Sequence, residues 1–506
     1  MKILVANRGE IAVRVMRACR ELGLRNVGVY SDGDRDAVHV RYADEAHHLG
    51  PSPAAESYLR SDRVIEVARR AGADAIHPGY GFLAENAAFA RACRDAGLLF
   101  IGPAPEVITL MGSKTAARQA ASRAGVPVVP GSEEPFGPDV PMEAIADTAR
   151  RLAYPVLVKA VAGGGGKGMR TVATPDDLAA AVRAARGEAE SAFGDAAIYL
   201  ERRLERTRHV EIQLLADRHG TVVPFVEREC SIQRRHQKVV EESPSPVVTA
   251  DLRRGMAAQA AALARAVGYT NAGTIEYLLD ADGRFYFLEM NTRLQVEHPV
   301  TEMVTGVDLV QWQIRIARGD ALDLDPERAI APRGHAIECR IYAEDPDRRF
   351  MPSPGTIVSL RSPSGPGIRD DSGVAAGSTV TVFYDSMISK LIGWGADRAQ
   401  AIARLRRALM EYQVLGVRTT VPFFRWLLAQ LDFEVARFDT GYLDRVLEHR
   451  TEPFAPVSEA DEEIAAMAAA LDAYFRLRPG APTTTPGHAA KDSAWKRAAR
   501  LDGVRS

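Results

Sequence analysis

Cysteine is scarce in this 506-residue sequence, and its four cysteines form no recognisable site. They are Cys19, Cys93, Cys230 and Cys339, which stand far apart and include no C-x-x-C pair. This spacing argues against a disulfide framework and against a zinc site built from cysteine thiolates. We therefore expect the protein to work in a reducing compartment, the cytoplasm.

An excess of charge of either sign is also missing. The 64 basic and 66 acidic residues give a net charge of −2. Composition therefore gives no reason to expect a nucleic-acid or membrane partner, and any basic site must be local. No apolar run approaches the roughly 20 residues of a membrane-spanning helix. The first residues lead directly into an apolar strand at Lys2–Ala6, without the apolar region of a signal peptide.

Apolar residues, by contrast, are plentiful enough for several cores. A hydrophobic fraction of 46% over this length predicts roughly two to four domains. The first hundred residues alternate strand patterns (Lys2–Ala6, Val27–Ser31, Ala75–His77, Leu98–Ile101) with helical patterns (Ile11–Leu22, Asp62–Ala71, Glu85–Ala96). This alternation predicts an α/β domain with a parallel, helix-covered sheet. The first strand–helix turn lacks G-x-G-x-x-G, so we expect no dinucleotide site there.

The C-terminal part of the chain predicts a separate α+β block. Strands are expected at His335–Ala343, Gly355–Leu360 and Val380–Phe383, followed by a helix at Arg398–Leu409. Beyond Glu448 the composition changes. A helical pattern at Glu459–Arg476 gives way to a Pro/Thr-rich segment, and we expect the last residues to be frayed.

The most informative stretch lies in the middle of the chain. Two apolar runs, Thr274–Leu279 and Arg284–Leu288, flank an Asp-Gly pair. This pattern predicts a β-hairpin. With Asp282-Gly283 as its two-residue turn, Glu276 lies directly opposite Glu289.

Two like charges directly opposed in a ladder repel each other, so this pairing needs something that offsets the repulsion. A divalent cation held by both carboxylates is the natural candidate, and Asn291 follows as a further oxygen ligand. The alternative is a solvated edge with two unrelated glutamates. We favour the cation because Leu278, Phe285 and Phe287 share the predicted face and imply burial, and buried carboxylates need partners.

Polar side chains crowd the segment that follows, N-T-R-L-Q-V-E-H-P at residues 291–299. Arg293 can clamp an anion, and Glu297 can act as a base if it lies near a substrate proton. Alone, this segment could be ordinary turn chemistry. Next to a carboxylate pair, it predicts a site.

A glycine-rich segment, residues 162–168, follows the apolar strand that ends at Lys159. It is not a Walker A motif, because Val161 and Gly168 stand where glycine and Ser or Thr are required. A G-x-G-x-x-G match is present, but Met169–Val172 reads as a strand and not as the helix of a dinucleotide site. We expect a flap whose backbone amides close over phosphates. The alternative is an ordinary flexible linker.

Four side chains that can carry a positive charge fall within five residues. They are Arg234, Arg235, His236 and Lys238. In a neutral protein such a cluster predicts an anion site, with a solvated basic loop as the alternative.

Together these motifs resemble those of the ATP-grasp biotin carboxylases, from Met1 to about Arg445. The matching segments read N-R-G-E-I-A, K-A-x-x-G-G-G-G-K-G-M-R, R-H-V-E-I-Q, R-E-C-S-I-Q-R-R-H-Q-K, E-M-N-T-R-L-Q-V-E-H-P-V-T-E and Y-D-S-M. The resemblance implies an N-terminal α/β domain (1–113) and an ATP-grasp α+β centre (114–320) with a mobile lid at about 131–203. It also implies an α+β C-terminal domain (333–447), followed by a tail (448–506) that is partly helical or disordered.

The resemblance also implies a role for each matching residue. Nucleotide contacts are implied for Lys114, Lys159, Gly163, Gly164, Gly165, Gly166, Met169, Glu201, Leu204, His209, Gln233, His236, Glu276, Leu278 and Glu289. Mg²⁺, or Mn²⁺, would be held by Glu276 and Glu289 with Asn291 nearby. The substrate pocket, chiefly for bicarbonate, would be formed by Lys238, Arg293, Gln295 and Val296, together with His236. Glu297 would deprotonate bicarbonate, and Arg340 would stabilise the biotin enolate.

The implied reaction uses ATP and bicarbonate to carboxylate biotin, as the first half-reaction of an acetyl- or propionyl-CoA carboxylase. Lys167 and Tyr342 stand where some relatives carry Arg and Asn, and both look like forms of the acyl-CoA carboxylase branch. The family attaches biotin to a lysine within M-K-M, which this sequence lacks. We therefore expect two partners, a separate biotin carboxyl carrier protein and a carboxyltransferase, and we expect the chain to form a homodimer.

Two other functions compete with this one. A carbon–nitrogen ligase of the same superfamily would share the carboxylate pair, but it would not need the R-L-Q-V-E-H segment or Arg340. A non-catalytic ATP-binding subunit is the second rival. The presence of every expected catalytic residue argues against it.

Overall fold

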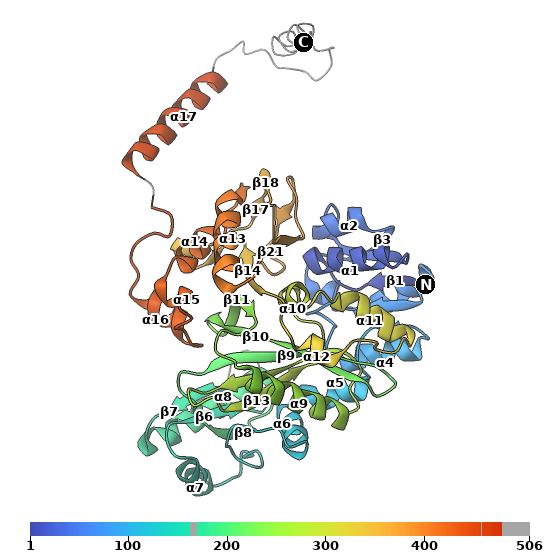
Figure 1. The fold of residues 1–506 in the computed structure, drawn as a ribbon, viewed down its shortest axis with the longest axis vertical. Helices are drawn as coiled ribbons and strands as arrows, with labels where there is room; N and C mark the ends of the chain where they lie inside the picture. Colours follow the sequence, from blue (N-terminus) through green and yellow to red (C-terminus); the bar gives the residue numbers. More distant parts are fainter. Residues whose placement is uncertain (162–168, 457, 478–506) are drawn as a thin grey trace. The chain divides into compact units, whose positions relative to one another are not determined.

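The computed structural model describes residues 1–161, 169–456 and 458–477. They belong to two units, Met1–Phe454 and Ala455–Ser506. The first unit contains every element up to α16 (Tyr442–Glu448), and the second contains α17 (Glu459–Leu477) (Figure 1).

A parallel sheet with the strand order β3-β2-β1-β4-β5 forms the N-terminal part. Its strands are β1 (Lys2–Val5), β2 (Arg25–Ser31), β3 (Glu45–Gly50), β4 (Ala75–His77) and β5 (Leu99–Phe100). Its helices are α1 (Gly9–Glu21), α2 (Val38–Tyr42), α3 (Ser61–Arg70), α4 (Ala87–Asp95) and α5 (Pro105–Gly112). Ile3 packs in one core with Ile11 of α1, and Leu4 packs in a second core with Val64 of α3. Both faces of the sheet are therefore buried, as the alternating pattern predicts.

The central sheet has eight strands in the order β13-β12-β9-β10-β11-β14-β21-β19. Its strands are β9 (Arg208–Ala216), β10 (Val222–Arg234), β11 (Gln237–Ser243), β12 (Asn271–Leu279), β13 (Phe285–Asn291), β14 (His335–Tyr342), β19 (Ile368–Ser372) and β21 (Met387–Gly395). All neighbouring strands run antiparallel. The sheet extends without a break from the predicted hairpin to the C-terminal block.

The two faces of the central sheet differ in polarity. Ile212 and Tyr277 lie in an apolar core with Met256 of α9 (Ala250–Ala266). The residues next to them along the strands, Glu211 and Glu276, are charged and also buried. Because successive side chains of a strand point to opposite faces, one face of this sheet builds a core and the other builds a polar site.

A separate antiparallel sheet, β7-β6-β8, consists of β6 (Val156–Ala160), β7 (Met169–Val172) and β8 (Ile198–Arg202). It packs against α7 (Met142–Leu152) and α8 (Leu178–Phe193) through Val156, Ile145 and Leu178. The predicted glycine flap, including Gly163, Gly164, Gly165 and Gly166, lies outside the described residues. Met169 begins the strand on its far side.

The remaining α-helices of the first unit are α6 (Lys114–Arg123), α10 (His298–Thr305), α11 (Leu309–Arg318), α12 (Pro326–Ala329), α13 (Arg398–Glu411), α14 (Val421–Leu428) and α15 (Leu431–Glu434). The short strands are β15 (Glu344–Asp345), β16 (Met351–Pro352), β17 (Gly355–Thr356), β18 (Ser359–Arg361), β20 (Thr379–Val380) and β22 (Gln413–Leu415). They form the two-stranded sheets β15-β16, β17-β20 and β18-β22. Figure 1 shows three groups of elements within the first unit, with α10 between them. Within the described residues, we find no helix whose length and apolarity would let it cross a bilayer.

The hairpin prediction is correct in its pairing and wrong in its turn. Glu276 does pair with Glu289. However, the last pair before the loop is Leu279 with Phe285, and a register shift restores the expected pairing at Glu276. The turn is thus longer than two residues. The shift also places Phe285 and Phe287 opposite Leu279 and Tyr277, in the apolar core, so they do not share a face with Leu278.

Two predicted strands of the C-terminal block are also wrong in part. The run Gly355–Leu360 is divided between β17, which pairs with β20, and β18, which pairs with β22. The predicted strand Val380–Phe383 ends at Val380. Val382 and Phe383 are 74% and 49% exposed, so their apolar character does not mark a buried strand here.

Candidate active site

One large cavity, of about 1290 Å³, lies over the polar face of the central sheet. Every described residue for which the resemblance implies a role lines it: Lys114, Lys159, Met169, Glu201, Leu204, His209, Gln233, His236, Lys238, Glu276, Leu278, Glu289, Asn291, Arg293, Gln295, Val296, Glu297 and Arg340. Residues more than 200 positions apart in sequence thus share one cavity. The roles implied for them stay predictions.

Glu276 is the most heavily bonded carboxylate of the hairpin. It accepts hydrogen bonds from Lys238 Nζ at 2.8 Å and from Asn291 Nδ2 at 2.9 Å, and His209 Nε2 lies 3.0 Å away. Burial alone would raise the pKa of Glu276, but Lys238 and His209 hold it well below its usual range. The repulsion that we expected from Glu289 is therefore offset in part by protein cations.

Glu289, in contrast, has no hydrogen bond or ion pair to any described residue, and its side chain is open to the cavity. Although the carboxylate faces the cavity, the surrounding protein removes part of its hydration, and this desolvation and the neighbouring Glu276 raise the pKa of Glu289. An unengaged carboxylate opposite a second carboxylate offers the oxygen ligands that Mg²⁺ prefers, so these residues fit the expected metal. Asn291 fits less well, because its Oδ1 accepts a hydrogen bond from Arg293 at 3.1 Å.

Lys238 joins three carboxylates at the centre of the site. Its Nζ donates to Glu211 at 2.6 Å, to Glu276 at 2.8 Å and to Glu297 at 2.7 Å. Burial would lower the pKa of Lys238, but the three glutamates raise it well above the usual lysine value. Lys238 is thus a fixed cation, and its three N–H groups are all engaged.

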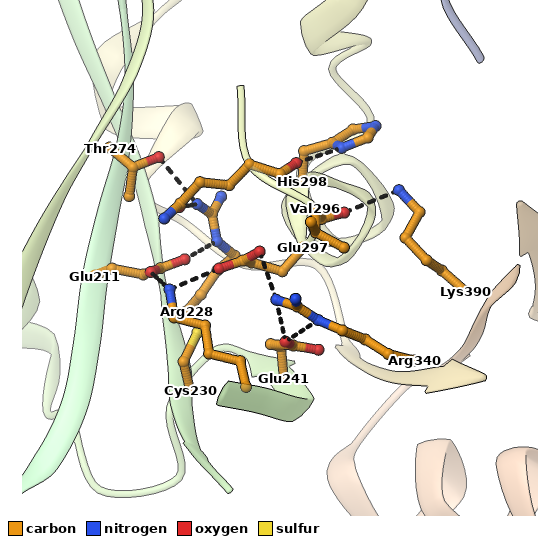
Figure 2. A network of polar contacts seen from close by, with 12 residues as sticks. Glu211, Arg228, Cys230, Glu241, Thr274, Val296, Glu297, His298, Arg340 and Lys390 are labelled. Atoms are coloured by element: carbon orange, nitrogen blue, oxygen red, sulfur yellow. Dashed lines mark hydrogen bonds and ion pairs between the residues drawn. The ribbon is translucent and has the colours of Figure 1, made fainter. Parts of the chain in front are cut away.

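Glu297 lies between this lysine and Arg340, and Figure 2 shows its contact with Arg340. Arg340 donates to Glu297 Oε2 at 2.9 Å and to Glu241 Oε1 at 2.7 Å. Burial would raise the pKa of Glu297, but Lys238 and Arg340 lower it to about 2. Glu297 is therefore ionised at neutral pH. A general base works best when its pKa lies near the operating pH, so Glu297 becomes an effective base only when a bound substrate takes over one of these two cations and its pKa rises.

The side of the cavity where we expect the nucleotide is built on β6 and β8. Lys159 forms an ion pair with Glu201, which also accepts a hydrogen bond from Arg118 at 3.2 Å. Burial lowers the pKa of Lys114 at the start of α6. Two lysines of one cavity can neutralise phosphate charge.

The basic cluster at residues 234–238 does not form one anion site. Lys238 points to the carboxylates, whereas Arg234 pairs with Glu344 at 2.9 Å and lies over the ring of Phe350. Arg235 and His236 are exposed in the turn between β10 and β11. A strand-to-strand turn separates side chains that are close in sequence, so the four residues do not act as one cluster. His236 and Lys238 both line the cavity, and an anion site that includes these two stays a prediction.

Sequence reasoning missed several residues of this network. Fully buried Arg228 donates to Gln213 at 2.9 Å and to Thr274 at 3.1 Å, and it also pairs with Glu211. Glu241 holds Arg340 from the neighbouring strand. Only the polar alternation of the R-H-V-E-I-Q segment signalled part of this network. Arg293, expected to be available for an anion, instead donates to Glu85 at 2.8 Å.

Comparisons with known proteins agree with the geometry. Three family models match: "Biotin carboxylase, N-terminal domain" at residues 1–108, "Carbamoyl-phosphate synthase L chain, ATP binding domain" at 113–325 and "Biotin carboxylase C-terminal domain" at 338–445. A pyruvate carboxylase subunit of Methanothermobacter thermautotrophicus is 50% identical over 493 residues, which cover 95% of this chain and 99% of that protein. The biotin carboxylase of Nostoc sp. is 51% identical over 445 residues, covering 88% and 99%.

A solved structure matches equally well. The biotin carboxylase domain dimer of Hydrogenobacter thermophilus 2-oxoglutarate carboxylase, determined with MgADP, ADP and bicarbonate, superimposes with a TM-score of 0.84 at 45% identity. The match covers 90% of this chain and 99% of that chain. Taken with the cavity and its carboxylate–lysine–arginine network, these similarities show that the chain belongs to the biotin carboxylase family and is an ATP-dependent ligase with the ATP-grasp fold.

Proposed function

We propose that the chain carboxylates N1′ of biotin on a separate carrier protein, with MgATP and bicarbonate as co-substrates. The observation that carries this proposal is the position of Glu297. It is buried, ionised and held between Lys238, on the side of the metal carboxylates, and Arg340, on the side of the C-terminal block. One base therefore touches the groups expected to hold both reactants.

The first step follows from this geometry. Lys238 and Arg293 would hold bicarbonate once each exchanges one of its present carboxylate partners for the anion. Glu297 then takes the proton of the bicarbonate, and the oxygen so freed attacks the γ-phosphate of ATP, releasing ADP and forming carboxyphosphate. Lys114 and Lys159 neutralise charge on the transferring phosphate. When bound by Glu276 and Glu289, Mg²⁺ would supply further neutralisation of that charge.

The second step uses Arg340. Carboxyphosphate breaks into CO2 and phosphate, the released phosphate takes the proton of N1′ of biotin, and the N1′ so freed attacks the CO2. The ureido nitrogen is too weakly acidic to react while neutral, so a fixed cation at the ureido oxygen is needed to stabilise the enolate. Arg340 fits this role, because Glu241 and Glu297 fix its guanidinium at the edge of the cavity.

The partners are part of the proposal. A biotin carboxyl carrier protein would bring the biotin, a carboxyltransferase would use the product, and two copies of this chain would form a homodimer in the cytoplasm. Support comes from the Methanothermobacter relative, which is named as one subunit of a larger carboxylase, and from the dimer of the Hydrogenobacter domain. We propose an acyl-CoA as the final acceptor. The carboxyltransferase would select it.

ATP cleavage by the purified chain tests the proposed function. ADP formation is expected to require bicarbonate and to rise when free biotin is added. ADP formation that does not depend on bicarbonate, or that requires an amine instead, would indicate a carbon–nitrogen ligase. No ADP formation under any of these conditions would indicate a non-catalytic subunit.

A further inference from the structure

A fully buried lysine lies directly behind the site, outside the residues used so far. Lys390 on β21 is 0% exposed. In the ladder it pairs with Arg340 of β14 on one side and with Asp371 of β19 on the other. Burial of an ammonium group is unfavourable unless the group is well paired, so the contacts of this side chain identify what the charge is used for.

Asp371 is not the main partner of Lys390, because Arg369 already binds it at 2.7 Å. Instead, the Lys390 ammonium donates to the backbone carbonyl of Val296 at 2.9 Å. The carboxylate of Glu10, from α1, lies 3.3 Å away. One ammonium therefore links the C-terminal block, the N-terminal sheet domain and the loop that carries the base.

Two neighbouring side chains thus hold two consecutive residues of that loop (Figure 2). Arg340 binds the carboxylate of Glu297 at 2.9 Å, and Lys390 binds the carbonyl of Val296 at 2.9 Å. That carbonyl belongs to the peptide that leads into Glu297. A third bond, from His298 Nδ1 to the carbonyl of Gln295 at 2.8 Å, closes the start of α10.

If only the carboxylate of Glu297 were held, the backbone of this residue could still change its orientation relative to the carboxylate. Holding the carbonyl before it as well fixes both ends of the residue. A misplacement of about 1 Å in a reacting group can cost about a hundredfold in rate. The second anchor therefore has a direct chemical consequence at Glu297 and at the adjacent predicted bicarbonate contacts, Gln295 and Val296.

We propose that Lys390, supported by Glu10, is a positioning residue for the base Glu297 and for the bicarbonate pocket. This inference rests on the proposed function. Lys390 touches no substrate. It acts through the Val296 carbonyl, so its loss should alter the use of bicarbonate far more than the use of ATP.

Lys390→Met, which keeps the length and removes the charge, tests this. We expect the KM for bicarbonate to rise about tenfold and kcat to fall about 10–100-fold, while the KM for ATP changes less than about twofold. Lys390→Arg restores a cation and a donor in a bulkier group, so it should recover part of both losses but not all of them. Lys2→Met is the matched control, because Lys2 also joins a backbone carbonyl, of Ala71 at 2.6 Å, to a glutamate, Glu45 at 2.7 Å, away from the cavity.

Three outcomes would overturn the inference: wild-type kinetics in Lys390→Met, equal changes in both KM values, or a fall in kcat alone that matches the loss of folded protein. If Lys390→Met does not fold, the comparison of Lys390→Arg with Lys2→Arg tests the inference instead. The KM for bicarbonate should then rise in Lys390→Arg and stay unchanged in Lys2→Arg. A wild-type protein that shows no bicarbonate-dependent ATP cleavage would instead refute the proposed function, so the two failures are distinguishable.

Discussion

At the scale of single residues, the site is a set of carboxylates neutralised by a few fixed cations. Lys238 alone binds three glutamates, and Arg228 and Arg340 bind two of them again from other directions. Because all N–H groups of Lys238 are engaged, an anionic substrate can reach this lysine only by replacing a carboxylate. Glu289 is the one carboxylate described above that no cation neutralises directly, since it has no ion pair among the described residues and is open to the cavity.

Replacing Glu289 by glutamine therefore tests metal binding with little structural disturbance. Removal of a group that supports a metal ligand typically weakens metal binding about 10–100-fold. We expect the Mg²⁺ concentration for half-maximal ATP cleavage to rise by at least this factor, with the melting temperature nearly unchanged. Magnesium titration of ADP formation measures this. Glu143→Gln, at an exposed position of α7, is the control. An unchanged magnesium requirement in Glu289→Gln would show that this carboxylate is not a ligand.

The sequence predicts the carboxylates of the hairpin and of the following loop better than it predicts the residues that bind this network from other strands. Glu276, Glu289 and Glu297 can be found from a hairpin pattern and a polar loop. Glu241 and Lys390 cannot, because their partners Arg340 and Val296 lie 99 and 94 residues away. Such contacts depend on strand order, and no local pattern encodes the order of eight strands.

At the scale of elements, the hairpin has the predicted pairing of Glu276 with Glu289 but not the predicted two-residue turn. A two-residue turn and a longer turn with a compensating register shift give the same opposition of Glu276 and Glu289. The shift turns Phe285 and Phe287 into the apolar core, which leaves the face of Glu276 for polar groups. A β-bulge of this kind re-aims side chains near a site.

The junction of β11, β14 and α13 gives a second prediction at this scale. Buried Glu242 on β11 binds His335 of β14 at 2.6 Å and Arg398 of α13 at 2.7 Å. Burial would raise its pKa, but these partners lower it from 4.5 to about 2. Since the folded pKa is depressed, the stabilisation is complete above about pH 4.5 and is lost as the pH falls through 2.

Glu242→Gln should accordingly lower the free energy of unfolding at pH 7 by about 3 kcal/mol. The difference from wild type should shrink as the pH is lowered from 4.5 towards 2. Urea unfolding at several pH values measures both effects. Glu411→Gln, which removes the exposed pair with Arg407, should change stability by less than about 1 kcal/mol. A deficit in Glu242→Gln that is independent of pH would contradict the assignment.

At the scale of the whole molecule, one continuous sheet unites the two halves of the proposed reaction. The strand order places the hairpin β12-β13, which carries the proposed Mg²⁺ ligands, and β14, which carries Arg340, in the same sheet. α10 lies against β10 and β14, and it begins directly after Glu297. The sequence predicts the α/β N-terminal domain and the α+β C-terminal block, but a sheet shared by two blocks of sequence is not visible in local periodicity.

The absence of M-K-M predicts that this chain is not itself biotinylated. Intact mass spectrometry after co-expression with a biotin ligase should give the mass of the unmodified 506-residue chain. A carrier protein expressed in the same cells serves as the positive control and should gain one biotin. A gain of one biotin on this chain would reveal an attachment site that the motif does not describe.

The central claim is that Glu297 activates bicarbonate and Arg340 serves biotin, although the two side chains are in contact. Phosphate release and carboxybiotin formation, measured separately in the same samples, test it most directly. In Glu297→Gln both products should fall, by about 10²–10⁴-fold. In Arg340→Ala, Lys238 still holds Glu297, so phosphate release should persist while carboxybiotin falls by about 10²–10³-fold. Arg234→Ala should keep the wild-type ratio. If Arg340→Ala also keeps that ratio, Arg340 is a structural ion-pair partner and the account is wrong.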